Sequence, residues 1–160
     1  MIRKTILWVL IILWMATIFF FSSQEATESK KVSSGVIKTV VKTIDVKDSL
    51  SEKEVESISE DLTFIVRKGA HFSAYALLCI LVALLLKEYK IIGGRQVFYS
   101  VGIAFLYACS DEFHQLFVNG RSGELRDVLI DTAVALFGVM LLLGITAIKN
   151  KKRKIPTQIL

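Results

Sequence analysis

Long apolar runs alternate with polar segments along the chain, a pattern that predicts several membrane-spanning helices. The apolar runs cover residues 5–21, 70–86, 97–117 and 128–148. Because a helix crosses the hydrocarbon core with roughly 20 apolar residues (range about 17–25), all four runs qualify as spans or come close. The middle two reach full length only by including polar residues. We therefore expect an all-α fold, an integral membrane four-helix bundle that forms a single domain over residues 1–160.

A patterned polar segment, residues 22–66, separates the first two spans. Its apolar residues recur at helical spacing in two sets, which are Val32, Val36, Ile37, Val40, Val41 and Ile44, and then Val55, Ile58, Leu62 and Ile65. The second set follows Ser51-Glu52-Lys53-Glu54, which has the form of a helix-capping box. Two amphipathic helices fit this pattern, and they either lie on the outer membrane surface, cap the bundle or link the spans as a solvated hairpin.

Composition agrees with a membrane protein and helps to orient it. Hydrophobic residues make up 53% of the chain, and its mean hydropathy is +0.55. An even number of spans places both termini on one side, where short basic segments touch the helix ends and the positive-inside rule acts most strongly. We therefore expect cytoplasmic termini and a basic cytoplasmic tail, residues 149–160. The net charge of +5 then favours contact with anionic lipids rather than with nucleic acid.

That orientation brings the polar residues of the spans to the extracytoplasmic side. Charge at mid-depth in hydrocarbon costs at least about 2–3 kcal/mol per residue, so such residues are usually paired, face the interior or are functional. The candidate ligand-binding residues are Gln24, Arg67, Lys68, His71, Tyr75, Asp111, Glu112, His114, Gln115, Arg121, Arg126, Asp127 and Asp131. We expect four helix ends to bring them together at one membrane depth.

Helical spacing predicts which of these side chains share a face. The sets are Lys68, His71 and Tyr75 in the second span, and Asp111, His114 and Gln115 in the third. Glu112 is displaced around the axis of the third span. In the fourth span, carboxylates and small residues form a stripe of Asp127, Asp131, Ala135 and Gly138. Small residues allow close helix approach in a bilayer, so we expect this stripe to face the interior.

Three sequence motifs carry most of the candidate residues. They are R-K-G-A-H-F-S-A-Y at residues 67–75, D-E-F-H-Q-L-F at residues 111–117 with Gly120-Arg121 beyond it, and Asp127 opening the last span. With Ser22-Ser23-Gln24 after the first span, they resemble the signature of the VanZ-like family. The resemblance covers nearly the whole chain apart from residues 25–60. One departure is Asp131, where the family pattern leads us to expect asparagine.

The resemblance implies a location and a phenotype, but no reaction. The family is named for a membrane protein associated with low-level resistance to the glycopeptide teicoplanin, and no established biochemical activity goes with it. It implies a multi-pass protein of the bacterial cell membrane, and a role in glycopeptide resistance is one hypothesis. The chemistry must be argued from the residues themselves.

The first hypothesis for the polar residues is binding of an anionic lipid. Four cations are expected at headgroup depth, which are Arg67, Lys68, Arg121 and Arg126. Arginine in particular binds phosphate in a bidentate manner. An anionic phospholipid or a polyprenyl-phosphate-linked envelope precursor would present phosphate at that level. The sequence has no Walker-type glycine loop, which argues against ATP-driven transport.

The second hypothesis is an enzyme that acts on the same phosphate-bearing lipids. Its candidate catalytic residues are His71, Asp111, Glu112 and His114, in which each histidine would be oriented by a carboxylate for acid/base chemistry. No activated serine or cysteine nucleophile stands out.

The third hypothesis is a purely structural charge network. In it Arg67 or Arg121 pairs with Asp111, Glu112 or Asp127, and His71 hydrogen-bonds Gln115 or Glu112. Substitutions would then destabilise the protein rather than leave it folded and inactive.

We expect neither a metal ion nor a cofactor. Two histidines and two carboxylates could bind a divalent ion, but Asp111-Glu112-x-His114 lacks the i, i+4 histidine pair of helical zinc motifs. Neighbouring basic residues also oppose a bound cation. Cys79 and Cys109 are expected to fill apolar space within their helices rather than form a disulfide. The oligomeric state is left open.

Overall fold

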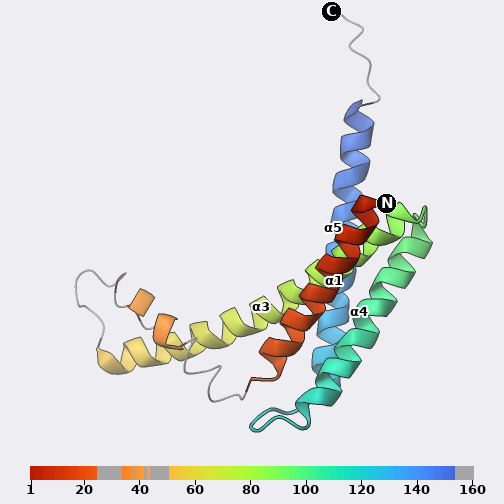
Figure 1. Ribbon diagram of the computed structural model, residues 1–160. Helices are drawn as coiled ribbons and strands as arrows, with labels where there is room; N and C mark the ends of the chain where they lie inside the picture. Colours follow the sequence, from red (N-terminus) through yellow and green to blue (C-terminus); the bar gives the residue numbers. More distant parts are fainter. Residues whose placement is uncertain (25–33, 38, 42, 44–50, 154–160) are drawn as a thin grey trace, which may run out of the picture.

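The computed structural model describes residues 1–24, 34–37, 39–41, 43 and 51–153, without the side chains of 52, 64, 67, 152 and 153 (Figure 1). Over these residues the chain is helical and contains no β-strand, which confirms the all-α prediction. The long helices are α1 (Ile2–Ser22), α3 (Glu52–Glu88), α4 (Gly94–Gln115) and α5 (Leu125–Arg153). The described residues from 34 to 43 are also helical, and the rest of the first amphipathic set lies outside the described residues.

α3 joins two elements that the sequence predicted separately. The Ser51 N–H donates to Glu54 Oε2 at 2.8 Å and the Glu54 N–H donates to Ser51 Oγ at 3.4 Å, which confirms the predicted capping box. The helix then runs to Glu88 without a break at Gly69, because one interior glycine costs only about 1 kcal/mol. Its 37 residues extend about 55 Å, well beyond the ~30 Å hydrocarbon core. The N-terminal part of α3 therefore extends away from α1, α4 and α5 (Figure 1).

α3 lies at the centre of the packing and contacts α1, α4 and α5. Leu78 of α3 and Ala135 of α5 are fully buried in this core. Gly138 allows α5 to approach α3 closely, because a Cβ at this position would lie 3.1 Å from the Ala76 Cβ. Asp131 is buried on the same side of α5, so the predicted stripe of carboxylates and small residues does face the interior.

Three of the four predicted spans are confirmed as helices that are long and apolar enough to cross a membrane. They lie within Ile2–Ser22, Lys53–Glu88 and Leu125–Lys151. α4 has 22 residues but is not among them. The reason is the polarity of its buried side, which carries Gln96, Ser100, Asp111, Glu112 and Gln115.

Candidate functional site

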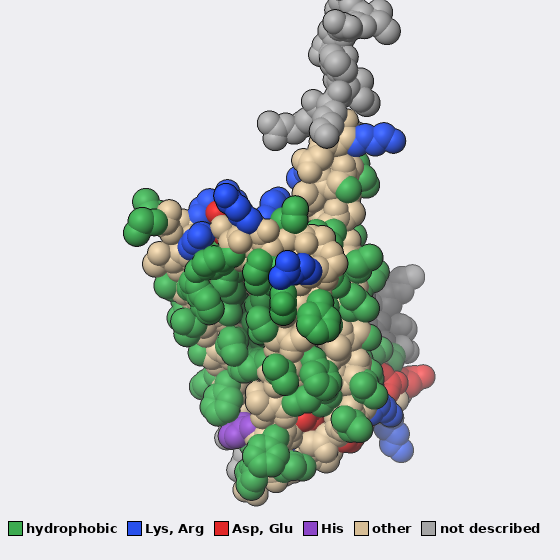
Figure 2. Space-filling model, turned by 90° about the vertical axis from the view of Figure 1, so that its right-hand side faces the viewer, with side chains coloured by type: hydrophobic (Ala, Val, Ile, Leu, Met, Phe, Trp, Pro, Cys, Tyr) green, Lys and Arg blue, Asp and Glu red, His purple; other side chains and the backbone are tan. Residues whose placement is uncertain are grey.

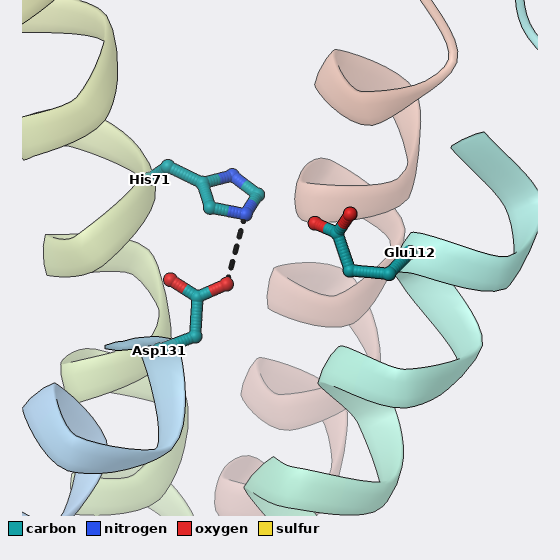
Figure 3. A group of neighbouring side chains, drawn as sticks. All are labelled: His71, Glu112 and Asp131. Carbon is teal, nitrogen blue, oxygen red and sulfur yellow. Dashed lines mark ion pairs between the residues drawn. The ribbon is translucent and has the colours of Figure 1, made fainter. Parts of the chain in front are cut away.

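Polar side chains from three helices meet where the C-terminal end of α4 lies beside the N-terminal end of α5. This polar cluster consists of His71 and Tyr75 on α3, Asp111, Glu112 and Gln115 on α4, and Asp131 on α5. Figure 3 shows His71, Glu112 and Asp131 pointing toward one another from their three helices. Apart from His71, every member of the cluster is at most 6% exposed. α3 contributes residues from its middle rather than from an end, because it extends well beyond the site.

His71 lies between two carboxylates. Its Nε2 is 3.1 Å from Asp131 Oδ2 and 3.9 Å from Asp111 Oδ2. The closer pair is an ion pair when His71 is protonated. The prediction that His71 bonds Gln115 or Glu112 is therefore wrong, because the packing of α3 on α5 places Asp131 closer to the ring.

Hydrogen bonds orient the two carboxylates of α4. Asp111 Oδ2 accepts from the Tyr75 hydroxyl at 3.2 Å and from Gln115 Nε2 at 3.3 Å. Glu112 Oε1 accepts from Gln115 Nε2 at 3.1 Å, and its Oε2 accepts from the Glu124 backbone N–H at 3.0 Å. Sequence reasoning missed Glu124, because it acts through its main chain and no side-chain pattern signals such a contact.

Several carboxylate oxygens of the polar cluster have no hydrogen-bond partner among the described residues. They are both oxygens of Asp131 and Oδ1 of Asp111, and these residues are only 1% and 2% exposed. An unsatisfied buried polar group costs about 1–3 kcal/mol, and more when it is charged. The cluster is therefore not a closed set of mutually satisfied groups.

Lys68 and Asp127 form an ion pair about one helical turn from His71 and Asp131. The Lys68 Nζ lies 2.5 Å from Asp127 Oδ2. Both side chains are partly buried, at 32% and 16% exposure. The charge-network hypothesis named Asp127 as one of three possible partners for Arg67 or Arg121, and in the structure Asp127 pairs with Lys68.

His114 faces α1 rather than the polar cluster. Its Nε2 lies 3.2 Å from Ser23 Oγ, and its ring centroid lies 4.5 Å from that of Phe19. At about 100° per residue, Glu112 and His114 fall on opposite flanks of Asp111, so packing decides which of them enters the cluster. In the structure Glu112 enters the cluster and His114 does not, which corrects the prediction that His114 joins Asp111 and Gln115 there. Ser23 was part of a quoted motif, but its contact with His114 was not foreseen.

The remaining candidates lie outside the polar cluster. Arg121 donates from Nη2 to the Phe21 carbonyl and from Nε to the Gln24 carbonyl, both at 3.0 Å. It thereby ties the loop after α4 to the end of α1, and Gln24 takes part through its main chain. Arg126 is exposed to solvent. The side chain of Arg67 lies outside the described residues.

His71, Glu112 and Asp131 form a compact group of potential ligands. Each offers one ligand atom, and the three atoms lie within 4.8 Å of one another. Such a group can transfer protons or hold a cation. Two nearby serines have their hydroxyls engaged elsewhere, because Ser73 donates to the Gly69 carbonyl and Ser110 donates to the main chain of α4.

Comparison with models of protein families gives one match, to the family described as VanZ/LLP1, over residues 7–147. The matched range includes every residue of the polar cluster and all of the candidate residues named above. No curated protein and no solved structure matches the chain.

Proposed function

The chain belongs to the VanZ/LLP1 family, and from this premise we propose that it is a multi-pass membrane protein whose polar cluster receives the headgroup of a phosphate-bearing lipid. The lipid is an anionic phospholipid or a polyprenyl-phosphate-linked envelope precursor. By binding such a lipid, the protein would change the access of a lipid-anchored glycopeptide of the teicoplanin type to its target.

In this proposal α4 also crosses the membrane, which brings the number of spans to four. Its outward side carries Phe98, Leu106 and Phe113, which are 74%, 66% and 64% exposed. Large apolar patches of this kind mark surfaces that contact a membrane or another protein. Figure 2 shows a band of hydrophobic side chains lying between two polar ends. Lipid would contact this side of α4, and polar groups of the protein contact its other side. This supports α4 as a span even though its inward residues lower its mean hydropathy.

The polar cluster then faces the outside of the cell. Lysine and arginine side chains gather at the opposite end of the hydrophobic band, next to the C-terminal part of α5 (Figure 2). At that end Arg3 lies 3.4 Å from Glu88 and Lys4 lies over the ring of Tyr89. The positive-inside rule supports a cytoplasmic location for this end.

The segment 22–66 is extracytoplasmic in the same proposal. On the projecting part of α3, Ile58, Leu62 and Ile65 are exposed by 38%, 39% and 62%. An apolar face on a projecting helix is stabilised when it lies in the headgroup region of a membrane. This favours a helix on the membrane surface over a solvated hairpin.

The Oδ1 atoms of Asp131 and Asp111, which have no partner among the described residues, carry the proposal. A structural charge network would satisfy its members internally, whereas a ligand site keeps groups available for its ligand. The hydroxyl or amine groups of a headgroup can donate to these oxygens. Its phosphate would bind at the rim, where Lys68 and the exposed Arg126 supply positive charge.

A second candidate function is acid/base catalysis on the bound headgroup. It is supported by the position of His71, whose Nε2 lies 3.1 Å from one carboxylate and 3.9 Å from another. Carboxylates at these distances stabilise the imidazolium and would allow His71 to accept a proton from a headgroup hydroxyl or from water. Product analysis on a co-purified lipid separates this function from binding alone.

Native mass spectrometry of the protein purified in nanodiscs tests lipid binding. We expect a phosphate-bearing lipid to remain bound to the wild type and to be retained about tenfold less by Lys68→Gln or Arg126→Gln, because each loses a charge-assisted contact. Arg95→Gln is the matched control, since it removes one exposed positive charge in the first turn of α4, away from the cluster. Lys68→Arg should restore retention.

The melting temperature of each variant separates binding from folding. Equal lipid retention by all variants, or a loss that occurs only in variants with a strongly lowered melting temperature, would refute the binding proposal and support a structural network.

A further inference from the structure

The polar cluster has an excess of negative charge. Asp111, Glu112 and Asp131 are three buried carboxylates. Among the side chains that the structure describes, His71 is the group next to them that can carry a positive charge. Lys68 does not compensate them, because it already pairs with Asp127. Among the described side chains, even a protonated His71 would leave two formal negative charges uncompensated, and buried charges are strongly unfavourable unless they are paired or bind a metal ion.

We infer that His71, Glu112 and Asp131 hold a divalent metal ion. Ligand atoms around a tetrahedral zinc ion lie about 3.4 Å from one another, given zinc–ligand distances of about 2.0–2.2 Å. The His71 Nε2 and Asp131 Oδ2 atoms are already 3.1 Å apart. All three ligand atoms lie within 4.8 Å of one another (Figure 3), so a shift of the Glu112 carboxylate by about 1 Å would bring the set close to ligand spacing.

Asp131 gives a second, independent indication of a missing partner. The residue is 1% exposed, its Oδ1 has no partner among the described residues, and its Oδ2 faces the His71 ring at 3.1 Å (Figure 3). Glu112, in contrast, is oriented by donors behind it, because Gln115 Nε2 and the Glu124 N–H each bond one of its oxygens. Outer hydrogen bonds of this kind orient metal ligands in proteins.

The donor set favours Zn²⁺ or Mn²⁺ over Ca²⁺ and Mg²⁺. One imidazole nitrogen with two carboxylates suits a transition metal, whereas Ca²⁺ and Mg²⁺ prefer oxygen ligands alone. Three protein ligands leave a coordination position open. A headgroup hydroxyl oxygen of the lipid would occupy that position while its phosphate stays at the rim, and this last step rests on the proposed function. The ion would thereby remove the repulsion between the phosphate and the buried carboxylates.

Metal content of the full-length protein in detergent tests the inference. After treatment with a chelator, reloading with ZnCl₂ or MnCl₂ and removal of free ion, we expect about one ion per chain by elemental analysis. His71→Gln and Asp131→Asn should lose it. His114→Gln is the matched control, because the chain has two histidines and His114 contacts α1 instead. Equal metal content in both histidine variants, or none in the wild type, would overturn the inference.

Thermal unfolding adds a readout whose sign distinguishes a metal site from a structural ion pair. In metal-free protein, Asp131→Asn should raise the melting temperature, because it removes an uncompensated buried charge. An ion pair that stabilises the fold predicts a lower melting temperature for the same variant. Zinc at about 100 times its Kd should raise the melting temperature of the wild type by about 5–10 °C and leave that of Asp131→Asn unchanged. Glu112→Gln serves as the second variant if Asp131→Asn does not fold, and no zinc-dependent rise in the wild type refutes the site.

Lipid retention with and without metal separates the failure of this inference from failure of the proposed function. Zinc bound by the wild type without any retained lipid would leave the metal site standing and refute lipid binding. Lipid retained equally by metal-free wild type and by Asp131→Asn, with no zinc bound, would refute the metal site and leave lipid binding standing.

Discussion

Gly138 of α5 lies directly against Ala76 of α3, so a side chain added at this position must push the two helices apart. A Cβ there would lie 3.1 Å from the Cβ, 3.2 Å from the carbonyl oxygen and 3.3 Å from the Cα of Ala76. Carbon atoms in contact prefer about 3.5–4.0 Å. Two of the three neighbours are backbone atoms, which cannot move without moving α3 itself.

The expected loss of stability follows from two opposing terms. Overpacking of a close interface costs about 1–3 kcal/mol, whereas replacing glycine by alanine within a helix stabilises it by about 0.5–1 kcal/mol. Gly138→Ala should therefore lower the free energy of unfolding by about 1 kcal/mol, and the larger Gly138→Leu by about 3 kcal/mol. Gly144 on the same helix has no neighbouring atom within 4 Å of its added Cβ, so Gly144→Ala should be neutral or stabilising.

Thermal unfolding of purified protein in one detergent measures the difference between the two alanine variants. At about 2–4 °C per kcal/mol for a chain of this size, the difference of about 1–2 kcal/mol means that Gly138→Ala should melt about 2–8 °C below Gly144→Ala. A melting temperature of Gly138→Ala at or above that of Gly144→Ala would show that the α3–α5 contact is not as close as described.

The remaining predictions concern hydrogen bonds and topology. Tyr75→Phe should lower the free energy of unfolding by about 1–3 kcal/mol in a thermal melt, because it removes a donor to a buried carboxylate; an equal effect of the exposed Tyr99→Phe would contradict this reasoning. Arg121→Gln should accelerate amide hydrogen exchange at the end of α1, because two carbonyls there lose their donor; unchanged exchange would mean that these bonds do not hold α1. In a cysteine-free background, an impermeant thiol reagent applied to intact cells should label Ser122→Cys and not Arg95→Cys, and the reverse result would invert the proposed orientation.

The composition of the site was largely predictable, because ionisable residues within apolar runs are costly wherever they are placed. This argument identified His71, Asp111 and Asp131 before any contact was known. Helical spacing also predicted that Asp131 faces the interior, on the same side of its helix as Gly138. It wrongly preferred His114 to Glu112, because both flank the same face and differ only in which neighbouring helix they meet.

The fold shows the same division between local and long-range information. The capping box at Ser51 is a local feature and was predicted correctly. The continuity of α3 through Gly69 was missed, because a change from polar to apolar composition resembles an element boundary even where the backbone does not break. The polar inner side of α4 likewise lowers its hydropathy without preventing it from packing as a long helix.

The sequence alone determined that the chain is helical, where its apolar runs lie and which charged residues interrupt them. These properties follow from composition and from a periodicity of about 3.6 residues per turn, which fixes the directions of side chains around a single helix. Only the tertiary structure decided that Lys68 pairs with Asp127, that His71 faces Asp131, and that Glu112 completes a group of three potential ligands. Periodicity contains no information on the relative height and rotation of two helices, and a shift of one residue, about 1.5 Å, is enough to exchange one partner for another.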